Sequence, residues 1–528
     1  MSWAGGIIRL LLRFRVYDLT LRSRLREPKQ NLPILFPGDA ERGRAIRVGD
    51  LIRLLRERGP VQTNVPVDLD QARSAQRFDW LADLHASEME TAETVARELT
   101  ALWIDAHPAW HDFSWADHLI VDRLANWMLY APFLLRGGDE IFREAFLDSM
   151  HRQARHVRRL NRFSMTGLDG FGRARSEIFY EIMFAGESRH LDDILSRLAR
   201  QIMDETFPDG GHRSRNPSRH MAAIGNLLDV HSTLTVAGRD PPPWLQAALA
   251  RMTPVLKMFC LGDGGLCGIN GSLPTAPAEV ERMLALAGVR TRAVVNAPHS
   301  GFQRLPAGQT VVLLDCGIAD RINDNESAGI LAFQFSSGRR KIVVNCGLPR
   351  LATPEVRTVC RGSAAHSTLI LAETNSSELI GVESMGQRRA KRVDCMRQEI
   401  DRNILVESEQ DGYLELFGVL HRRALYLSPD GTDIRGEDRL TGGGGVGGVI
   451  RFHLHPDVGA SLVEGGRSVL LRSGKTEGWR FQTSADRPAL EDSIYFGDGV
   501  PRHCCQIVVS FAHEGPSTLL KWRFARER

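Results

Sequence analysis

Long apolar runs are absent from this 528-residue sequence. No stretch approaches the roughly 18 consecutive apolar residues that a membrane-spanning helix needs, which argues against a membrane-embedded protein. The eight cysteines show no C-x-x-C spacing, and most of them lie in apolar, strand-like runs. This pattern is typical of reduced core residues and argues against a zinc knuckle or a disulfide framework.

Net charge is low and lysine is scarce. A formal charge of +3 argues against a dedicated nucleic-acid-binding protein. Only six of the 67 basic residues are lysines. The planar guanidinium group of arginine suits carboxylate and sulfate ligands, although a genome-wide codon bias is the simpler explanation of the excess.

The chain is longer than one hydrophobic core usually supports, and its pattern changes once along its length. From about Asp79 to Gly288 apolar residues recur at helical spacing, with short glycine-containing loops that predict antiparallel helical hairpins. After Pro298 the pattern becomes alternating, with turns every ten or so residues, which predicts an antiparallel β-sandwich. We therefore predict a basic amphipathic segment over 1–40, a helical domain over 41–290 and a β-sandwich over 291–528.

The basic N-terminal segment has no small-residue cleavage site of the kind that follows a signal peptide. Its arginines interrupt a short apolar run, which predicts an amphipathic helix that could touch a membrane surface.

Five motifs resemble the heparinase II/III-like family of polysaccharide lyases, and together they cover most of the chain. They are FPDGGHRSRNPSRH (207–220), AGILAFQFSSGRRKIVVNCG (328–347), RGSAAHSTLIL (361–371), HRRALYLSPDGTDIRGEDRL (421–440) and IRFHLHP (450–456). The resemblance implies an α/α toroid followed by an antiparallel β-sandwich, with a uronate-bearing anionic polysaccharide between them. It implies β-elimination as the reaction, and the cell envelope or periplasm as the location. With no clear signal peptide, the cytoplasm is the alternative location.

The metal site of related lyases is altered in this sequence. By the resemblance, Ser327 and Asn345 stand at positions where relatives have a histidine and an aspartate ligand, and only His366 remains. Serine and asparagine are poor zinc ligands. We therefore predict that the protein has no cofactor and that the zinc of its relatives has been lost.

The predicted catalytic residues are Arg219, His220, Asn325 and His366. By the resemblance, Arg219 replaces the tyrosine that protonates the leaving group, and arginine cannot donate a proton near neutral pH. Arg219 and Asn325 would neutralise the substrate carboxylate, and His366 or His220 would remove the proton. The general acid stays unassigned.

Five further residues are predicted to bind substrate, each with a structural alternative. Arg213, Arg215 and Asn216 precede a predicted helix whose partial positive charge favours an anion, but Asn216 is most simply a helix N-cap before Pro217. Arg422 and Arg423 could meet sulfate or carboxylate groups, while charge pairing on a strand is the alternative.

Two functions remain open at this stage. The first is a lyase that cleaves an anionic polysaccharide by β-elimination. The second is a catalytically degenerate protein that keeps the lyase fold and either binds a glycan or has a structural role at the cell envelope. The sequence gives no information on the oligomeric state.

Overall fold

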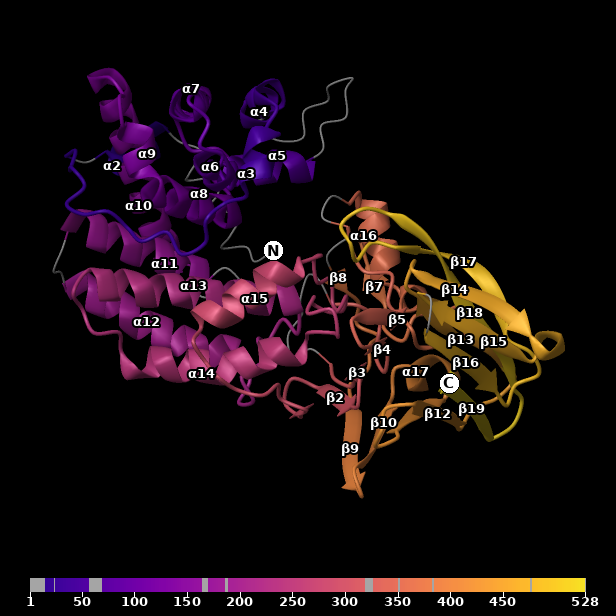
Figure 1. Cartoon of the computed structure of the whole chain (residues 1–528). Helices are drawn as coiled ribbons and strands as arrows, with labels where there is room; N and C mark the ends of the chain where they lie inside the picture. Colours follow the sequence, from indigo (N-terminus) through magenta and orange to yellow (C-terminus); the bar gives the residue numbers. More distant parts are fainter. Residues whose placement is uncertain are drawn as a thin grey trace. The chain divides into compact units, whose positions relative to one another are not determined.

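The computed structural model describes residues 15–22, 24–56, 69–163, 170–185, 189–318, 326–349, 352–381, 384–474 and 477–527. Asn325 and residues 1–14 of the predicted N-terminal helix lie outside these ranges. Figure 1 shows the described helices in the indigo-to-magenta first half of the chain and most strands in the orange-to-yellow second half. The predicted order of helices followed by strands is confirmed.

The helices of the first half are amphipathic segments joined by short loops, as their spacing predicts. They are α2 (Arg15–Leu21), α3 (Ala40–Arg44), α4 (Val48–Leu55), α5 (Leu69–Arg77), α6 (Trp80–Ala86), α7 (Ala92–Ala106), α8 (Asp117–Leu129), α9 (Ala131–Leu135), α10 (Glu140–Phe163), α11 (Gly170–Tyr180) with a π-helical turn over Glu181–Ala185, α12 (Arg189–Glu205), α13 (Pro217–Val236), α14 (Pro243–Met258) and α15 (Pro277–Leu286). None of the helices in the described ranges has the length and apolar character that crossing a bilayer requires.

The strands form two large antiparallel sheets. The first has the order β1 (Asn296–Ala297), β2 (Phe302–Ala307), β3 (Thr310–Asp315), β4 (Phe333–Ser337), β5 (Arg340–Val344), β13 (Val446–Leu454), β18 (Arg502–His513) and β17 (Ala489–Tyr495), with β6 (Leu369–Leu371) also paired to β13. The second has the order β14 (Val458–Val463), β15 (Ser468–Ser473), β16 (Glu477–Thr483), β19 (Ser517–Glu527), β12 (Asp433–Thr441), β11 (Leu420–Leu427), β10 (Asn403–Gln410) and β9 (Val393–Ile400).

Short elements complete the second half. They are the small strand pair β7 (Leu379–Ile380) and β8 (Ser384–Met385), the helices α16 (Pro354–Arg361) and α17 (Leu414–Phe417), and two 3-10 turns, over Ser363–Ala365 and Glu464–Gly466.

The two large sheets face each other across one apolar core. Phe333 of the first sheet stacks on Trp522 of the second, with ring centroids 5.2 Å apart. Phe452 forms T-shaped contacts with both rings. Alternate residues of each strand point into this core, as the period of a strand requires. This is the predicted β-sandwich.

The chain divides into two compact units, and they do not coincide with the helical and strand halves. The first unit is Met1–Asp204 with Gly225–Gln246, and the second is Glu205–Ile224 with Ala247–Arg528. The loop before α13, most of α14 and all of α15 thus belong to the same unit as the sandwich. The domain boundaries at residues 40 and 290 stay predictions.

Candidate functional site

The loop before α13 is fixed by Asn216 and Arg215. The Asn216 carboxamide oxygen accepts hydrogen bonds from the Arg219 backbone N–H, at 3.0 Å, and from the Ser218 hydroxyl, at 2.8 Å. Asn216 is therefore the N-cap of α13, which begins at Pro217. Its amide nitrogen donates to the Asn270 carbonyl at 2.8 Å. Asn216 is almost fully buried, so both ends of this predicted substrate-binding side chain are used inside the protein.

Arg215 lies at the centre of a buried group that we call the Asn270 cluster: Arg215, Asn216, Asn270, Asp315 and Ser327. The guanidinium group forms an ion pair with the Asp315 carboxylate at the end of β3, and each side chain is at most 5% exposed. It also donates to the carbonyls of Ser300, at 2.8 Å, and Gly301, at 3.3 Å. A buried charge needs such partners because its desolvation is costly. Arg215 therefore has a structural role in this conformation, and its contact with substrate stays a prediction.

Asn270 extends the cluster to the segment after β3. Its amide nitrogen donates to Asp315 Oδ2 and to the Arg215 carbonyl, both at 3.2 Å, and its oxygen accepts the Ser327 backbone N–H at 3.4 Å. Asn270 has φ +47°, a backbone conformation that asparagine tolerates better than most residues. Sequence reasoning missed Asn270 and Asp315. The signal that could have found Asp315 is its charge at the end of the apolar strand TVVLLD.

His220 is held on both sides of its ring. Nδ1 accepts the His212 backbone N–H at 3.2 Å, and Nε2 lies 2.9 Å from the Met252 carbonyl. A carbonyl oxygen only accepts, so Nε2 carries the proton in the neutral ring. Burial lowers the His220 pKa from 6.5 to about 4. The predicted role of His220 in proton removal stays untested, and this geometry leaves no lone pair for it.

Arg213 and Arg219 are half-buried, unlike Arg215. The Arg213 guanidinium lies over the Phe207 ring, 4.9 Å from its centroid. Arg219 is in the first turn of α13, where the partial positive charge of the helix N-terminus favours an anion. Both stay candidates for substrate contact.

Asn345, His366 and Arg423 meet at Ser367, and we call these four residues the Ser367 cluster. The Asn345 oxygen accepts the Ser367 backbone N–H at 2.9 Å, and its amide nitrogen donates to the Gly268 carbonyl at 3.1 Å. Arg423 Nη1 donates to the Ser367 carbonyl at 3.1 Å. Two of the three predicted metal positions, Asn345 and His366, are therefore adjacent in space, but the Asn345 side chain is used at both ends.

Arg423 is part of a buried ion pair in the sandwich core. It contacts both Asp438 oxygens, through Nε at 2.8 Å and Nη2 at 3.0 Å, and neither side chain has any exposed area. His421 Nε2 and Trp522 Nε1 also bond to the Asp438 carboxylate. These donors hold the Asp438 pKa below its usual range against the opposing effect of burial. Arg423 is thus a core residue, while the adjacent Arg422 points to the other face of β11 and pairs with Glu407 on β10.

His366 differs from His220 in its main-chain partners. Among the described residues, both ring nitrogens of His220 bond to the main chain, but only one nitrogen of His366 does. Nδ1 donates to the Gly362 carbonyl at 2.7 Å, which leaves Nε2 with a lone pair in the neutral ring. Burial lowers the His366 pKa. The ring packs against Gly329, where a Cβ would lie 2.5 Å from His366 Cδ2, so only glycine is compatible with this position. Of the two predicted catalytic histidines, His366 is the one whose geometry still suits a base or a ligand.

The described residues do not fit the zinc site of the related lyases. The carboxamide oxygen and nitrogen of Asn345 both bond to the protein itself. Ser327 bonds to Asn270 through its backbone N–H. Within the described ranges, no group of three or more His, Cys, Asp or Glu side chains is placed to hold a metal ion.

A helical half followed by a two-sheet sandwich of this topology is the fold of polysaccharide lyases. Heparinase III matches 99% of this chain and 91% of its own with a TM-score of 0.71 and 13% identity. A mutant heparan sulfate lyase of Pedobacter heparinus matches 99% of this chain and 89% of its own with a TM-score of 0.61 and 16% identity. These likenesses establish the fold.

The sequence of the second half matches a known domain. Residues 289–523 match the model of the C-terminal domain described as heparinase II/III-like. This part of the chain is therefore a heparinase II/III-like C-terminal domain, and the match supports the family that the five motifs predicted. It also resembles FtsZ-localized protein C of Caulobacter vibrioides, with 27% identity over 502 residues, 90% of this chain and 85% of the relative.

The Asn345 geometry predicts the outcome of restoring the aspartate found in relatives. In Asn345→Asp the carboxylate would face the Gly268 carbonyl with no proton to donate, and we expect a loss of about 3 kcal/mol in stability at pH 7. Burial would raise the pKa of the new carboxyl group, so the loss should fade as the pH falls below that pKa and a proton returns. Urea unfolding at pH 7 and at pH 5 measures both effects.

Asn296→Asp is the matched control, because exposed Asn296 only accepts a hydrogen bond, from Gln303, and aspartate also accepts. It should change stability by less than about 0.5 kcal/mol. An Asn345→Asp protein as stable as the wild type at pH 7 would show that the amide is not the donor to Gly268.

Proposed function

We propose that this chain binds a uronate-bearing anionic polysaccharide and does not cleave it. The fold supports a polysaccharide lyase-like protein, and the solved structures of that fold include a heparan sulfate lyase. The open question is whether the chain keeps the chemistry of β-elimination.

β-Elimination at a uronate needs three things of the protein. It must neutralise the carboxylate, remove the C5 proton with a base, and protonate the leaving oxygen. Arg215, Asn216 and Arg423 could have neutralised a carboxylate, but each is buried in bonds to the protein itself.

The single observation that carries the proposal is the state of His220. This candidate base has its Nδ1 and Nε2 atoms bonded to the main chain, and its pKa is far below neutral. A general base works best with a pKa near the operating pH. We propose in addition that the protein works without zinc, because the Asn345 carboxamide replaces a metal ligand with two internal hydrogen bonds.

A spectroscopic assay tests whether the protein cleaves. Purified protein is incubated with heparan sulfate, hyaluronan and alginate, with and without added zinc, and the ultraviolet absorbance of an unsaturated uronate is followed. Heparinase III is the positive control. We expect no absorbance change with any substrate and, by isothermal titration calorimetry, binding of at least one of them.

A steady rise in absorbance with one substrate would contradict the proposal. The variant His366→Ala then locates the chemistry, since His366 is the candidate base with a lone pair left. Loss of the product in this variant would establish the lyase alternative, with His366 as the proton acceptor.

The relative in Caulobacter vibrioides motivates a proposal for location. We propose that this chain also localises with FtsZ, as the name of that relative states for it. A fluorescent fusion of the full chain imaged with labelled FtsZ in the native bacterium should give coincident signals. Fluorescence spread evenly through the cell, like that of the fluorescent tag alone, would contradict the proposal.

A further inference from the structure

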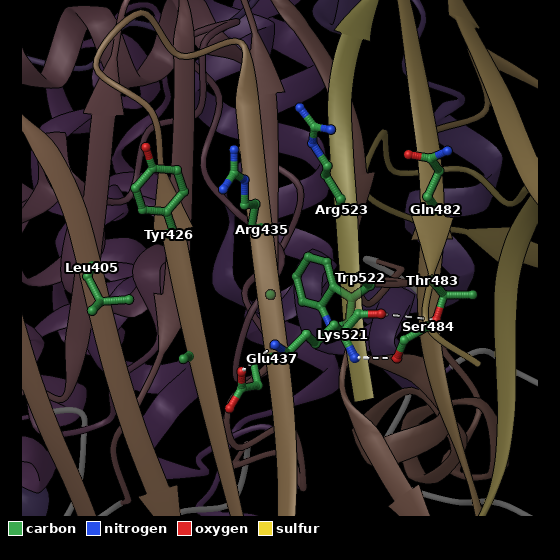
Figure 2. Close-up of a pocket in the computed structure, with 12 residues that line it drawn as sticks. Leu405, Tyr426, Arg435, Glu437, Gln482, Thr483, Ser484, Lys521, Trp522 and Arg523 are labelled. Carbon is green, nitrogen blue, oxygen red and sulfur yellow. Dashed lines mark hydrogen bonds and ion pairs between the residues drawn. The ribbon is translucent and has the colours of Figure 1, made fainter. Parts of the chain in front are cut away.

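The outer face of the eight-stranded sheet contains a hollow of about 420 Å³. This volume lies within the range of small-molecule sites. Its residues come from β10, β11, β12, β19 and β16 and the turn after β16, all in the second compact unit. Figure 2 shows Tyr426, Arg435, Arg523 and Gln482 in one row on four neighbouring strands, with their polar ends pointing the same way.

The floor of the hollow is apolar and fixed. It is lined by Leu405, Ala424, Gly436 and Trp522. Trp522 is held from the core side by its hydrogen bond to Asp438 and by stacking on Phe333. A Cβ at Gly436 would lie 2.0 Å from an atom of the Trp522 ring, so glycine is required where the indole lies against β12.

The charges around the hollow are mainly positive. Arg435, Lys521 and Arg523 line it, with side chains 60%, 65% and 46% exposed, and Glu437 is the one lining residue of opposite charge among those described. The hollow thus combines an apolar floor with an excess of cationic groups. An anionic ligand fits this arrangement better than a neutral or cationic one.

The two arginines are preorganised by one carboxylate. Asp433 accepts from Nε of Arg435 at 2.8 Å and from Nε of Arg523 at 2.7 Å, and it also contacts Nη2 of each. The Asp433 contacts therefore use one edge of each guanidinium group and leave the Nη1 donors for other partners. One negative charge between two positive ones leaves a net positive charge, so a second carboxylate or a sulfate could bind beside Asp433.

The rim supplies further hydrogen-bonding groups. Gln482, Thr483 and Ser484 lie on one side and Glu437 on the other. Amide, hydroxyl and carboxylate groups of this kind suit a ligand with several hydroxyls, and an apolar floor suits the C–H face of a sugar ring. Tyr426 forms a further wall, with the Arg435 guanidinium 5.2 Å from its ring centroid.

We propose that this hollow binds a saccharide unit carrying a carboxylate or a sulfate group, held by Arg435 and Arg523. The inference rests on the proposed function, because it names the surface through which the chain holds an anionic polysaccharide. It assigns binding to the outer face of the sandwich, away from Arg215, His220 and Asn345. Arg422 lies on the same face of β11, two residues from Ala424, and its predicted contact with substrate would then be part of this surface.

The test compares two double variants of the full chain. Arg435→Gln/Arg523→Gln removes the two cations of the hollow. The control Arg392→Gln/Arg472→Gln removes two exposed arginines that do not line it. Calorimetry measures the Kd for three oligosaccharides: heparin, which carries sulfate and carboxylate; hyaluronan, which carries carboxylate alone; and neutral dextran.

We expect Arg435→Gln/Arg523→Gln to weaken binding of a charged oligosaccharide at least tenfold, the control to change it less than twofold, and dextran not to bind. Binding of hyaluronan would identify the carboxylate as sufficient, and binding of heparin alone would identify the sulfate. Because Asp433 loses its partners in the first variant, Gln482→Glu provides a second test that leaves the sheet intact. Its added negative charge beside Arg523 should weaken binding severalfold.

The outcomes separate this inference from the proposed function. If the wild type binds a charged oligosaccharide and neither hollow variant weakens it, the inference is wrong while the proposed function stands. If the wild type binds none of the charged glycans, both are wrong.

Discussion

The ion pair between Arg215 and Asp315 is the constraint on which the predicted site depends. It is buried, it joins the start of α13 to the end of β3, and Asn270 connects it to Asn216 and Ser327. Removing one partner of such a pair typically costs about 3–5 kcal/mol, because the other charge is left buried and unpaired. The cluster therefore keeps the lyase architecture in this region while leaving Arg215 no freedom to meet a substrate.

In the Ser367 cluster, too, side chains at predicted site positions make structural hydrogen bonds. A carboxamide at position 345 makes two neutral hydrogen bonds where a carboxylate would need a cation. The neighbouring Arg423 obtains its counter-charge from Asp438 within the core. Exposed cationic groups are found on the outer face of the eight-stranded sheet, where Arg435 and Arg523 both form ion pairs with Asp433. Binding without cleavage is consistent with both arrangements.

Local features of this structure were predictable from sequence, and distant partners were not. The change from helical to alternating periodicity gave the order of helices and strands, and the Asn216-Pro217 pair gave the N-cap of α13. Strand alternation requires the adjacent Arg422 and Arg423 to point to opposite faces, but it does not say which face is the core. The core face is identified by the bonds of Asp438 to Arg423 and Trp522. The burial of Arg215 depends on its ion pair with Asp315, 100 residues later in the chain. Asn325 lies outside the described residues, so its predicted role stays open.

The central claim is that His220, Arg215 and Arg423 are committed to internal hydrogen bonds, and the protonation of His220 tests it most directly. Nitrogen-15 NMR of histidine-labelled protein, assigned with the variant His220→Gln, reports the tautomer and the pKa of this ring. The account predicts a neutral ring protonated at Nε2 that does not titrate between pH 8 and pH 5, since the His220 pKa is about 4. A His220 ring that titrates between pH 6 and pH 7 would show that it is available as a base, and would contradict the account.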